Sequence, residues 1–275
     1  MKNLIIRALT GIIFVVVLVS AICIHPIFFL ILFCIITGLT LWEFGGLVKH
    51  YENANLQRAV NVLGGVYLFI ATFVYANGLT DGKIFLPYLL FIMLTMIADY
   101  KAPNPINNWA FTLFAQIYCA GTFSMLNFIG AEPGTPGVMS YTPLFIMAIF
   151  IFVWLDDTGA YLVGSLIGKR KLFERISPKK SWEGFFGGLI LVLASSQAFA
   201  WFAPEISRLN WLGLATTVVL FGTWGDLIES LLKRTLGVKD SGHILPGHGG
   251  MLDRFDSVML AVPASYIYIE LFIRN

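Results

Sequence analysis

Charged side chains are scarce in this sequence. Of its 275 residues, 12% are Asp, Glu, Lys or Arg and 57% are hydrophobic, whereas a typical soluble domain is about 25% charged. The mean hydropathy of +0.79 agrees with the composition. This balance excludes a soluble globular domain, a disordered chain and a fibrous repeat. It predicts a protein that crosses a membrane several times.

Several common site motifs are also missing. The three cysteines are widely spaced in apolar runs and form no metal-binding pair. The chain contains no G-x-x-x-x-G-K-[ST] loop, no G-x-G-x-x-G after a strand and no G-x-S-x-G, which argues against P-loop, Rossmann and serine-hydrolase sites. His243 and His248 are five residues apart with no cysteine nearby, so a zinc site is disfavoured.

Long apolar runs provide the membrane-spanning segments that the composition predicts. Nine of them occur, at about 8–24, 26–48, 59–79, 84–98, 109–130, 142–167, 184–203, 209–232 and 254–273. About 20 apolar residues span a bilayer as a helix. The runs are continuous and do not alternate, which favours helices over barrel strands. We therefore predict an all-α, polytopic integral membrane helix bundle with about nine transmembrane helices.

The basic residues are distributed unevenly between the loops. With nine spans, 15 of the 18 Lys and Arg residues fall on the side of the N-terminus. The exceptions are Lys83, Arg208 and Arg274. Cytoplasmic loops carry the excess of Lys and Arg, so we expect the N-terminus and the two longest basic loops to be cytoplasmic.

The first polar cluster is the pair Asp156 and Asp157 in the sixth apolar run. An Asp at the bilayer centre costs about 2.5–3.5 kcal/mol, so two adjacent ones need a partner, water or a cation. The alternative is that both lie near the interface and cap a helix.

The second polar cluster is the basic loop 168–184, which ends in Ser177-Pro-Lys-Lys-Ser-Trp-Glu-Gly. Its Lys and Arg side chains are typical of a segment that binds either anionic lipid or a phosphate at the start of a helix. Ser181 and Gly184 do not form a capping box, which requires Glu or Gln at the second position.

The third and densest cluster is 226–256. Asp226, Glu229 and Lys233 share one helix face because of their spacing. Asp253 and Asp256 are expected in the first turn of the last span, where the helix dipole favours one carboxylate. Three carboxylates that converge at one depth repel each other unless a divalent ion neutralises them, and oxygen ligands favour Mg²⁺.

Residues 230–256 match a known signature. The pattern is S-x-[LIVMF]-K-R-x4-K-D-x-[GSA]-x2-[LIF]-[PG]-x-H-G-G-[LIVM]-x-D-R-[LIVMFT]-D, and every specified position is met. The matching residues are Ser230, Leu232, Lys233, Arg234, Lys239, Asp240, Gly242, Leu245, Pro246, His248, Gly249, Gly250, Met251, Asp253, Arg254, Phe255 and Asp256. The chain therefore resembles the phosphatidate cytidylyltransferase (CDP-diacylglycerol synthase) family. The segments that begin at Arg7, Asp157 and Ser177 are also similar to family patterns.

The resemblance implies an integral membrane enzyme, a homodimer, that converts CTP and phosphatidic acid to CDP-diacylglycerol and pyrophosphate. It also implies a metal centre near Asp226, Asp253 and Asp256 that requires Mg²⁺, with K⁺ or another Mg²⁺ as a second cation. We expect the protein in a bacterial inner membrane, with its site at the cytoplasmic surface, among membrane lipids and with no nucleic-acid partner. Residues 1–135 are expected to form a scaffold and dimer contact and 136–275 to carry the site, within one continuous membrane domain.

On this basis each site residue receives an expected role. The expected metal ligands are Asp226, Asp253 and Asp256, which with Lys239 and Arg254 form the catalytic set. Lys179 and Lys180 are expected to bind the triphosphate, and Lys233, Arg234, Lys239 and Arg254 phosphates of lipid or nucleotide. Further expected members of the substrate site are Asp157, Ser177, Ser181, Ser230, Asp240 and His248. Asp240 either contacts the metal or pairs with a neighbouring cation.

Two other functions stay open at this point. An ion-coupled transporter also has many spans and buried carboxylates, but the polar clusters of this chain all follow residue 153. A CTP-dependent lipid kinase would share the nucleotide and transfer the γ-phosphoryl group.

Overall fold

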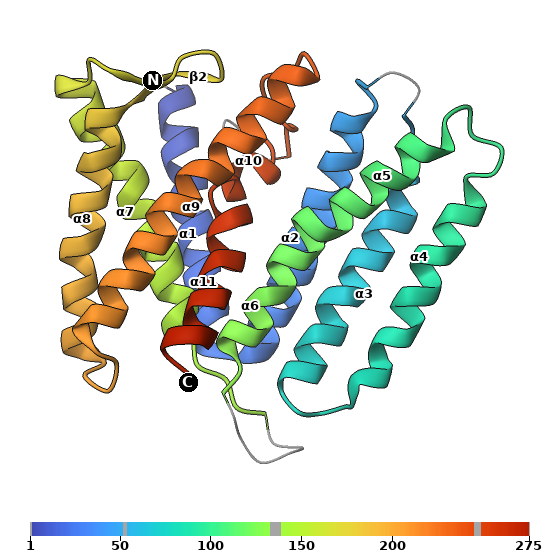
Figure 1. Ribbon diagram of the computed structural model, residues 1–275, viewed down its shortest axis with the longest axis horizontal. Helices are drawn as coiled ribbons and strands as arrows, with labels where there is room; N and C mark the ends of the chain where they lie inside the picture. The colour runs from blue at the N-terminus through green and yellow to red at the C-terminus, as the bar shows by residue number, and fades with distance from the viewer. Residues whose placement is uncertain (1, 52–53, 133–138, 245–248, 275) are drawn as a thin grey trace. The chain divides into compact units, whose positions relative to one another are not determined.

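The structure is a computed structural model that describes residues 2–51, 54–132, 139–244 and 249–274, with side chains from residue 9 onward. Helices dominate it (Figure 1). The elements are α1 (Lys2–Ile24), α2 (Pro26–Val48), α3 (Arg58–Ala76), η1 (Gly82–Phe85), α4 (Leu86–Ala98), α5 (Pro105–Ala115), η2 (Gln116–Gly121), α6 (Thr122–Gly130), α7 (Leu144–Ile167), β1 (Lys171–Phe173), β2 (Ser177–Ser181), α8 (Trp182–Phe202), α9 (Arg208–Thr235), α10 (Leu252–Phe255) and α11 (Val258–Phe272).

All nine predicted apolar runs are helical. Among the described residues, seven helical segments are long and apolar enough to cross a membrane. Two shorter apolar helices, Leu9–Ile24 and Gly82–Ala98, occupy the other two predicted runs. The prediction of an all-α polytopic membrane protein is confirmed.

Two local features differ from the expectations. The basic loop contains an antiparallel pair of strands, β1 and β2, in which Lys171 pairs with Ser181 and Phe173 with Ser177. The last apolar run is interrupted by a turn between α10 and α11, at Asp256 and Ser257. There Asp256 Oδ1 accepts a hydrogen bond from Ser257 N at 2.6 Å. Such a local side-chain bond competes with the helical backbone, so Asp253 and Asp256 do not share one uninterrupted helical turn.

The chain forms two compact units. One comprises 1–143 with 235–255, and the other 144–234 with 256–275. The expected division of roles between 1–135 and 136–275 stays a prediction.

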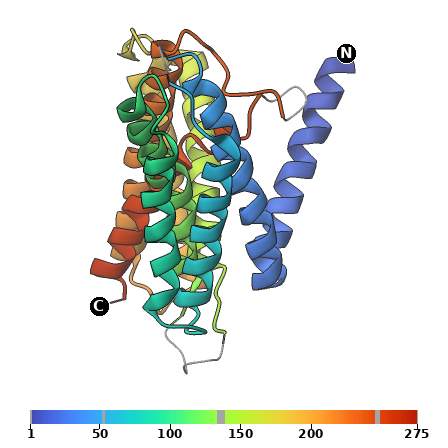
Figure 2. The same cartoon turned by 90° about the vertical axis from the view of Figure 1, so that its right-hand side faces the viewer.

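The first unit is organised around α2. In Figures 1 and 2, α3 lies between α2 and α4. The Phe33 ring of α2 is fully buried and lies 4.7 Å from that of Phe29, 6.0 Å from that of Phe123 and 6.5 Å from that of Phe255. Phe255 belongs to α10, so the core of this unit holds the end of the signature segment.

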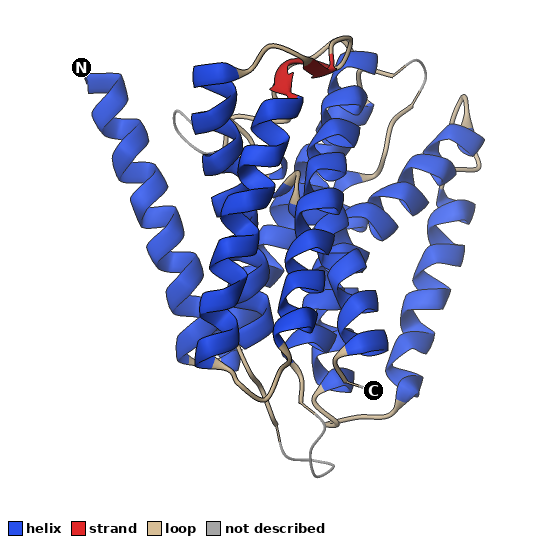
Figure 3. Ribbon diagram, turned by 60° about the vertical axis from the view of Figure 1, so that its left-hand side comes forward, coloured by secondary structure: helices blue, strands red, loops and turns tan. Residues whose placement is uncertain are grey.

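The second unit contains a very close helix pair, α7 with α8. A Cβ added to Gly159 would lie 2.9 Å from the Gly188 Cα, and one added to Gly184 would lie 2.8 Å from the Ala160 carbonyl oxygen. Small residues let helix backbones approach closely in membranes. The strands, red in Figure 3, lie at one end of the two helices that they connect. This close pair therefore provides a rigid base for the basic loop.

Gly188→Ala tests this packing. The new Cβ would lie 2.8 Å from the Asp156 carbonyl oxygen, so we expect the free energy of unfolding to fall by about 1–3 kcal/mol. Gly82→Ala is the control, because nothing lies within 4 Å of its added Cβ. Denaturation of the purified protein in detergent measures both, and equal stabilities would contradict the close packing.

Candidate active site

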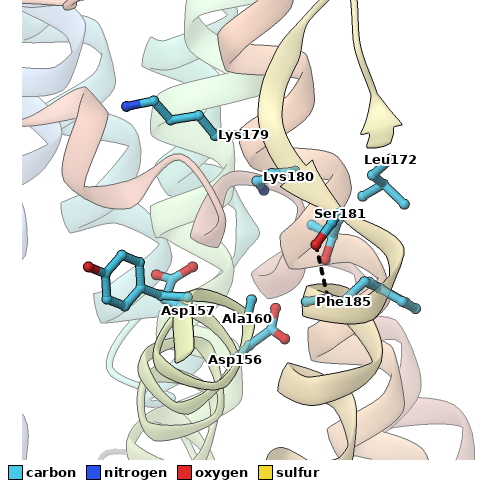
Figure 4. A pocket seen from close by; sticks show the side chains of 11 residues that line it. Asp156, Asp157, Ala160, Leu172, Lys179, Lys180, Ser181 and Phe185 are labelled. Carbon is cyan, nitrogen blue, oxygen red and sulfur yellow. Dashed lines mark hydrogen bonds between the residues drawn. The ribbon is translucent and has the colours of Figure 1, made fainter. Parts of the chain in front are cut away.

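A cavity in the second unit collects several of the predicted site residues. Asp157 of α7 lines it together with Lys179, Lys180 and Ser181 at the end of β2 (Figure 4). Asp156 lines the same cavity. Carboxylates of a helix and lysines of a strand thus line one cavity, although they belong to different polar clusters of the sequence.

Ser181 fixes where the strand ends and the helix begins. It is the N-cap of α8, and its Oγ accepts a hydrogen bond from Gly184 N at 3.2 Å. The sequence correctly shows no capping box, but the serine caps the helix by itself. Trp182 N also donates to the Arg170 carbonyl oxygen at 2.9 Å. Lys179 and Lys180 are held at the cavity because they directly precede this cap.

Lys180 connects the strand to the carboxylates of α9. Its ammonium group forms an ion pair with Asp226, whose Oδ1 accepts a hydrogen bond from Ser230 Oγ at 3.2 Å. Both side chains of the ion pair are partly buried, with 29% and 22% exposed. This exposure leaves the pair accessible to a ligand that competes for either charge.

Asp256 adds a further carboxyl group to this region. Asp256 is partly buried and lies within electrostatic range of the carboxyl groups of Asp226, Glu229 and Asp157. The structure therefore brings together two of the three predicted metal ligands, Asp226 and Asp256. Glu229 in turn accepts a hydrogen bond from Lys233 Nζ at 3.0 Å in the interior.

Asp156 and Asp157 lie in the middle of α7, so the alternative that they cap a helix end is wrong. Asp156 Oδ1 is buried and has no hydrogen-bond partner among the described residues. A Cβ on Gly188 would overlap this oxygen, which shows how closely the carboxylate lies against α8. The predicted site residues did not include Asp156, although its position deep in an apolar run was a signal for it.

Asp253 belongs to the first unit. Its Oδ2 accepts hydrogen bonds from Ser241 N and Gly250 N, both at 2.9 Å. The carboxylate of Glu43 in α2 contacts the same segment through Ser241 Oγ and Leu252 N. Sequence reasoning missed Glu43, although it is a carboxylate within the second apolar run.

The other predicted residues lie in several places. Lys239 and Asp240 line a cavity of the first unit with His50 and His243. Arg234 and Arg254 are exposed, and Ser177 is partly exposed at the start of β2. His248 lies outside the described residues.

The donor chemistry suits a hard divalent cation. Among the residues that the structure describes, no three His, Cys, Asp or Glu side chains are close enough to hold one metal ion as they stand. Mg²⁺, however, usually takes one or two carboxylates and completes its shell with water and substrate phosphates. Asp226 and Asp256 are carboxylates of the second unit, and their role as metal ligands, together with Asp253, stays a prediction.

Comparison with known proteins adds independent evidence. Residues 5–272 match the model of the cytidylyltransferase family. Proteins named phosphatidate cytidylyltransferase are similar to part of the chain: one from Staphylococcus epidermidis is 54% identical over 124 residues, and one from Staphylococcus aureus is 52% identical over 121. Each match covers 43% of this chain and 46% of the relative, less than half of its length.

Ser181→Ala tests the cap at the cavity. Loss of the bond to Gly184 N should lower the free energy of unfolding by about 0.5–2 kcal/mol. Ser165→Ala is the control, because that exposed hydroxyl donates only to the Leu162 carbonyl oxygen of its own helix. Denaturant titration in detergent compares the two, and an equal effect on both would refute the capping role.

Proposed function

Because the chain belongs to the cytidylyltransferase family, we propose that it is a phosphatidate cytidylyltransferase, which makes CDP-diacylglycerol and pyrophosphate from CTP and phosphatidic acid. The similar staphylococcal proteins have that name. The observation that carries the proposal is the cavity that Asp157, Lys179 and Lys180 line together, at which Lys180 also pairs with Asp226. Phosphate groups and their cations need both kinds of charge at one place.

The reaction needs no side chain as a base. The second pKa of a phosphate monoester is about 6, so phosphatidic acid is mostly a dianion at pH 7. One of its oxygens attacks the α-phosphorus of CTP and forms the new P–O bond. The bond from that phosphorus to the bridging oxygen breaks, and pyrophosphate leaves with its electron pair. Catalysis then consists of positioning and charge neutralisation.

The basic residues supply that neutralisation. Lys179 and Lys180 bind the triphosphate, and because Lys180 is paired with Asp226, the nucleotide competes with this carboxylate for the ammonium group. The remaining cations bind phosphates of the lipid or nucleotide. They are Lys233, Arg234, Lys239 and Arg254.

Mg²⁺ is the cofactor of this proposal, with Asp226, Asp253 and Asp256 as its protein ligands. When bound, it offsets negative charge on the phosphates and polarises their oxygens. K⁺ or another Mg²⁺ is the second cation. The oxygen ligands and the closeness of the acidic groups of Asp226 and Asp256 support the choice of these two residues.

The size of the cavity limits what it holds. It encloses about 210 Å³, less than the roughly 300–1,000 Å³ of most ligand pockets. We therefore assign it to the phosphate groups of the nucleotide. The acyl chains of the lipid substrate remain in the surrounding bilayer.

The proposal also covers location and assembly. The uneven distribution of Lys and Arg supports a cytoplasmic N-terminus and a site at the cytoplasmic surface, where soluble CTP meets the lipid. The staphylococcal relatives support a bacterial cell membrane. A homodimer completes the proposal.

Product analysis of the purified protein with labelled CTP tests the function. We expect pyrophosphate and a cytidylated lipid in equal amounts, because one bond is exchanged per turnover. CDP with a phosphorylated lipid would identify a kinase instead. Absence of both reactions in lipid vesicles with saturating Mg²⁺ would overturn the proposal and favour a transporter.

Asp256→Asn tests the carboxylate site. Loss of this charge should lower kcat by at least about 100-fold, the scale of removing one electrostatic contact from a transition state. Membrane insertion and yield should not change. Glu205→Gln removes an exposed carboxylate from a loop of the same unit and should keep full activity. Near-normal turnover of the Asp256 variant at saturating Mg²⁺ would exclude a metal role for this residue.

A further inference from the structure

Glu43 is a buried carboxylate in an apolar helix. It lies in α2, in a segment of mean hydropathy 2.3, and only 5% of it is exposed. A carboxylate in such surroundings is costly unless hydrogen bonds or charges compensate it. An apolar side chain would fill the same space at lower cost, so the position calls for a functional explanation.

Within the described part of the chain, Glu43 accepts its hydrogen bonds from the signature segment. Glu43 Oε2 accepts a hydrogen bond from Leu252 N at 2.8 Å and another from Ser241 Oγ at 3.2 Å. These two donors are 11 residues apart in the chain. One carboxylate oxygen therefore joins both ends of the segment 241–253.

Ser241 and Asp253 bind each other at the same place. Ser241 N donates to Asp253 Oδ2 at 2.9 Å, and Asp253 N donates to Ser241 Oγ at 3.3 Å. The serine hydroxyl thus accepts from Asp253 and donates to Glu43. A change at Glu43 consequently reaches Asp253 through a single hydroxyl group.

Two signature glycines make room for the carboxylate. A Cβ on Gly242 would lie 2.5 Å from Glu43 Oε1, and one on Gly250 would lie 2.5 Å from Oε2. A side chain at position 250 would therefore crowd Glu43 Oε2 and the Ser241 hydroxyl, and one at position 242 would make Glu43 Oε1 shift. The signature specifies glycine at position 250 and admits Gly, Ser or Ala at position 242, so contact with Glu43 accounts for the glycine at position 250.

The other oxygen, Glu43 Oε1, is buried and has no hydrogen-bond partner among the described residues. A buried polar atom without a partner is unfavourable. Glu43 is thus a costly way to stabilise the fold. This cost is consistent with a role in positioning the segment 241–253.

We propose that Glu43 is a positioning residue for cytidylyl transfer, which fixes Asp253 by joining both ends of the segment 241–253. This inference depends on the proposed function for its catalytic consequence. The anchoring of the segment by Glu43 does not depend on the proposed function, because it rests on contacts within one unit.

Three substitutions separate the reach of the side chain from its charge. Glu43→Gln keeps an oxygen that accepts both hydrogen bonds, Glu43→Asp keeps the charge but is one methylene too short, and Glu43→Ala removes both. Thr40→Ala is the matched control, because Thr40 is also fully buried in α2 but its hydroxyl donates only to Ile36 O and Thr37 O.

Hydrogen–deuterium exchange of the purified protein, without substrate, measures directly whether Glu43 holds the segment 241–253. In Glu43→Ala and Glu43→Asp, we expect peptides that contain Ser241 and Leu252 to exchange at least about 10-fold faster than in the wild type. The Gln variant and Thr40→Ala should match the wild type. Unchanged exchange in both the Ala and Asp variants would overturn the proposal.

Kinetics then test the catalytic consequence. Loss of a group that orients a ligand typically costs about 10–100-fold, so kcat of the Ala and Asp variants should fall by this factor. The KM for CTP should stay within about 2-fold, and the Gln variant should recover most of the rate. If instead Asp were active and Gln inactive, the negative charge would be the essential property and the positioning role would be wrong. If the wild-type chain did not transfer a cytidylyl group, only the proposed function would be contradicted. Hydrogen–deuterium exchange would still show whether Glu43 holds the segment 241–253.

Discussion

The cost of placing carboxylates in an apolar helix bundle determines much of this structure. Asp226 is met by a lysine, Asp253 by backbone amides, and Glu43 by a hydroxyl and an amide. In each case at least one compensating donor comes from another segment of the chain. Because the charges cannot be solvated by lipid, they fix loops and strands that apolar packing alone would leave undetermined.

The membrane helices could be predicted from the sequence because hydrocarbon requires continuous apolar runs of sufficient length. The nine runs therefore appear as helices with few changes at their ends. The β1–β2 pair could not be predicted in this way. Its short strands carry many charged residues, and its position depends on the Ser181 cap and on the Arg170 carbonyl that receives Trp182 N.

Only part of the candidate site could be predicted from the sequence. Asp226, Asp256 and Lys180 could be singled out because charge is rare in this chain, and the structure brings these three into one unit. Glu43 was missed because its partner Ser241 is 198 residues away, and no local pattern links them. Asp253 was predicted as a ligand, but its bonds to Ser241 N and Gly250 N depend on a loop closure that spacing alone does not reveal.

The strand β2 has one further consequence. Lys179 is exposed whereas Lys180 is partly buried against Asp226, and the next residue, Ser181, is the N-cap of α8. Because the cap fixes the end of the strand, a residue inserted between Lys180 and Ser181 would move the ammonium group away from Asp226. A residue added in the turn between the strands would leave both lysines in place.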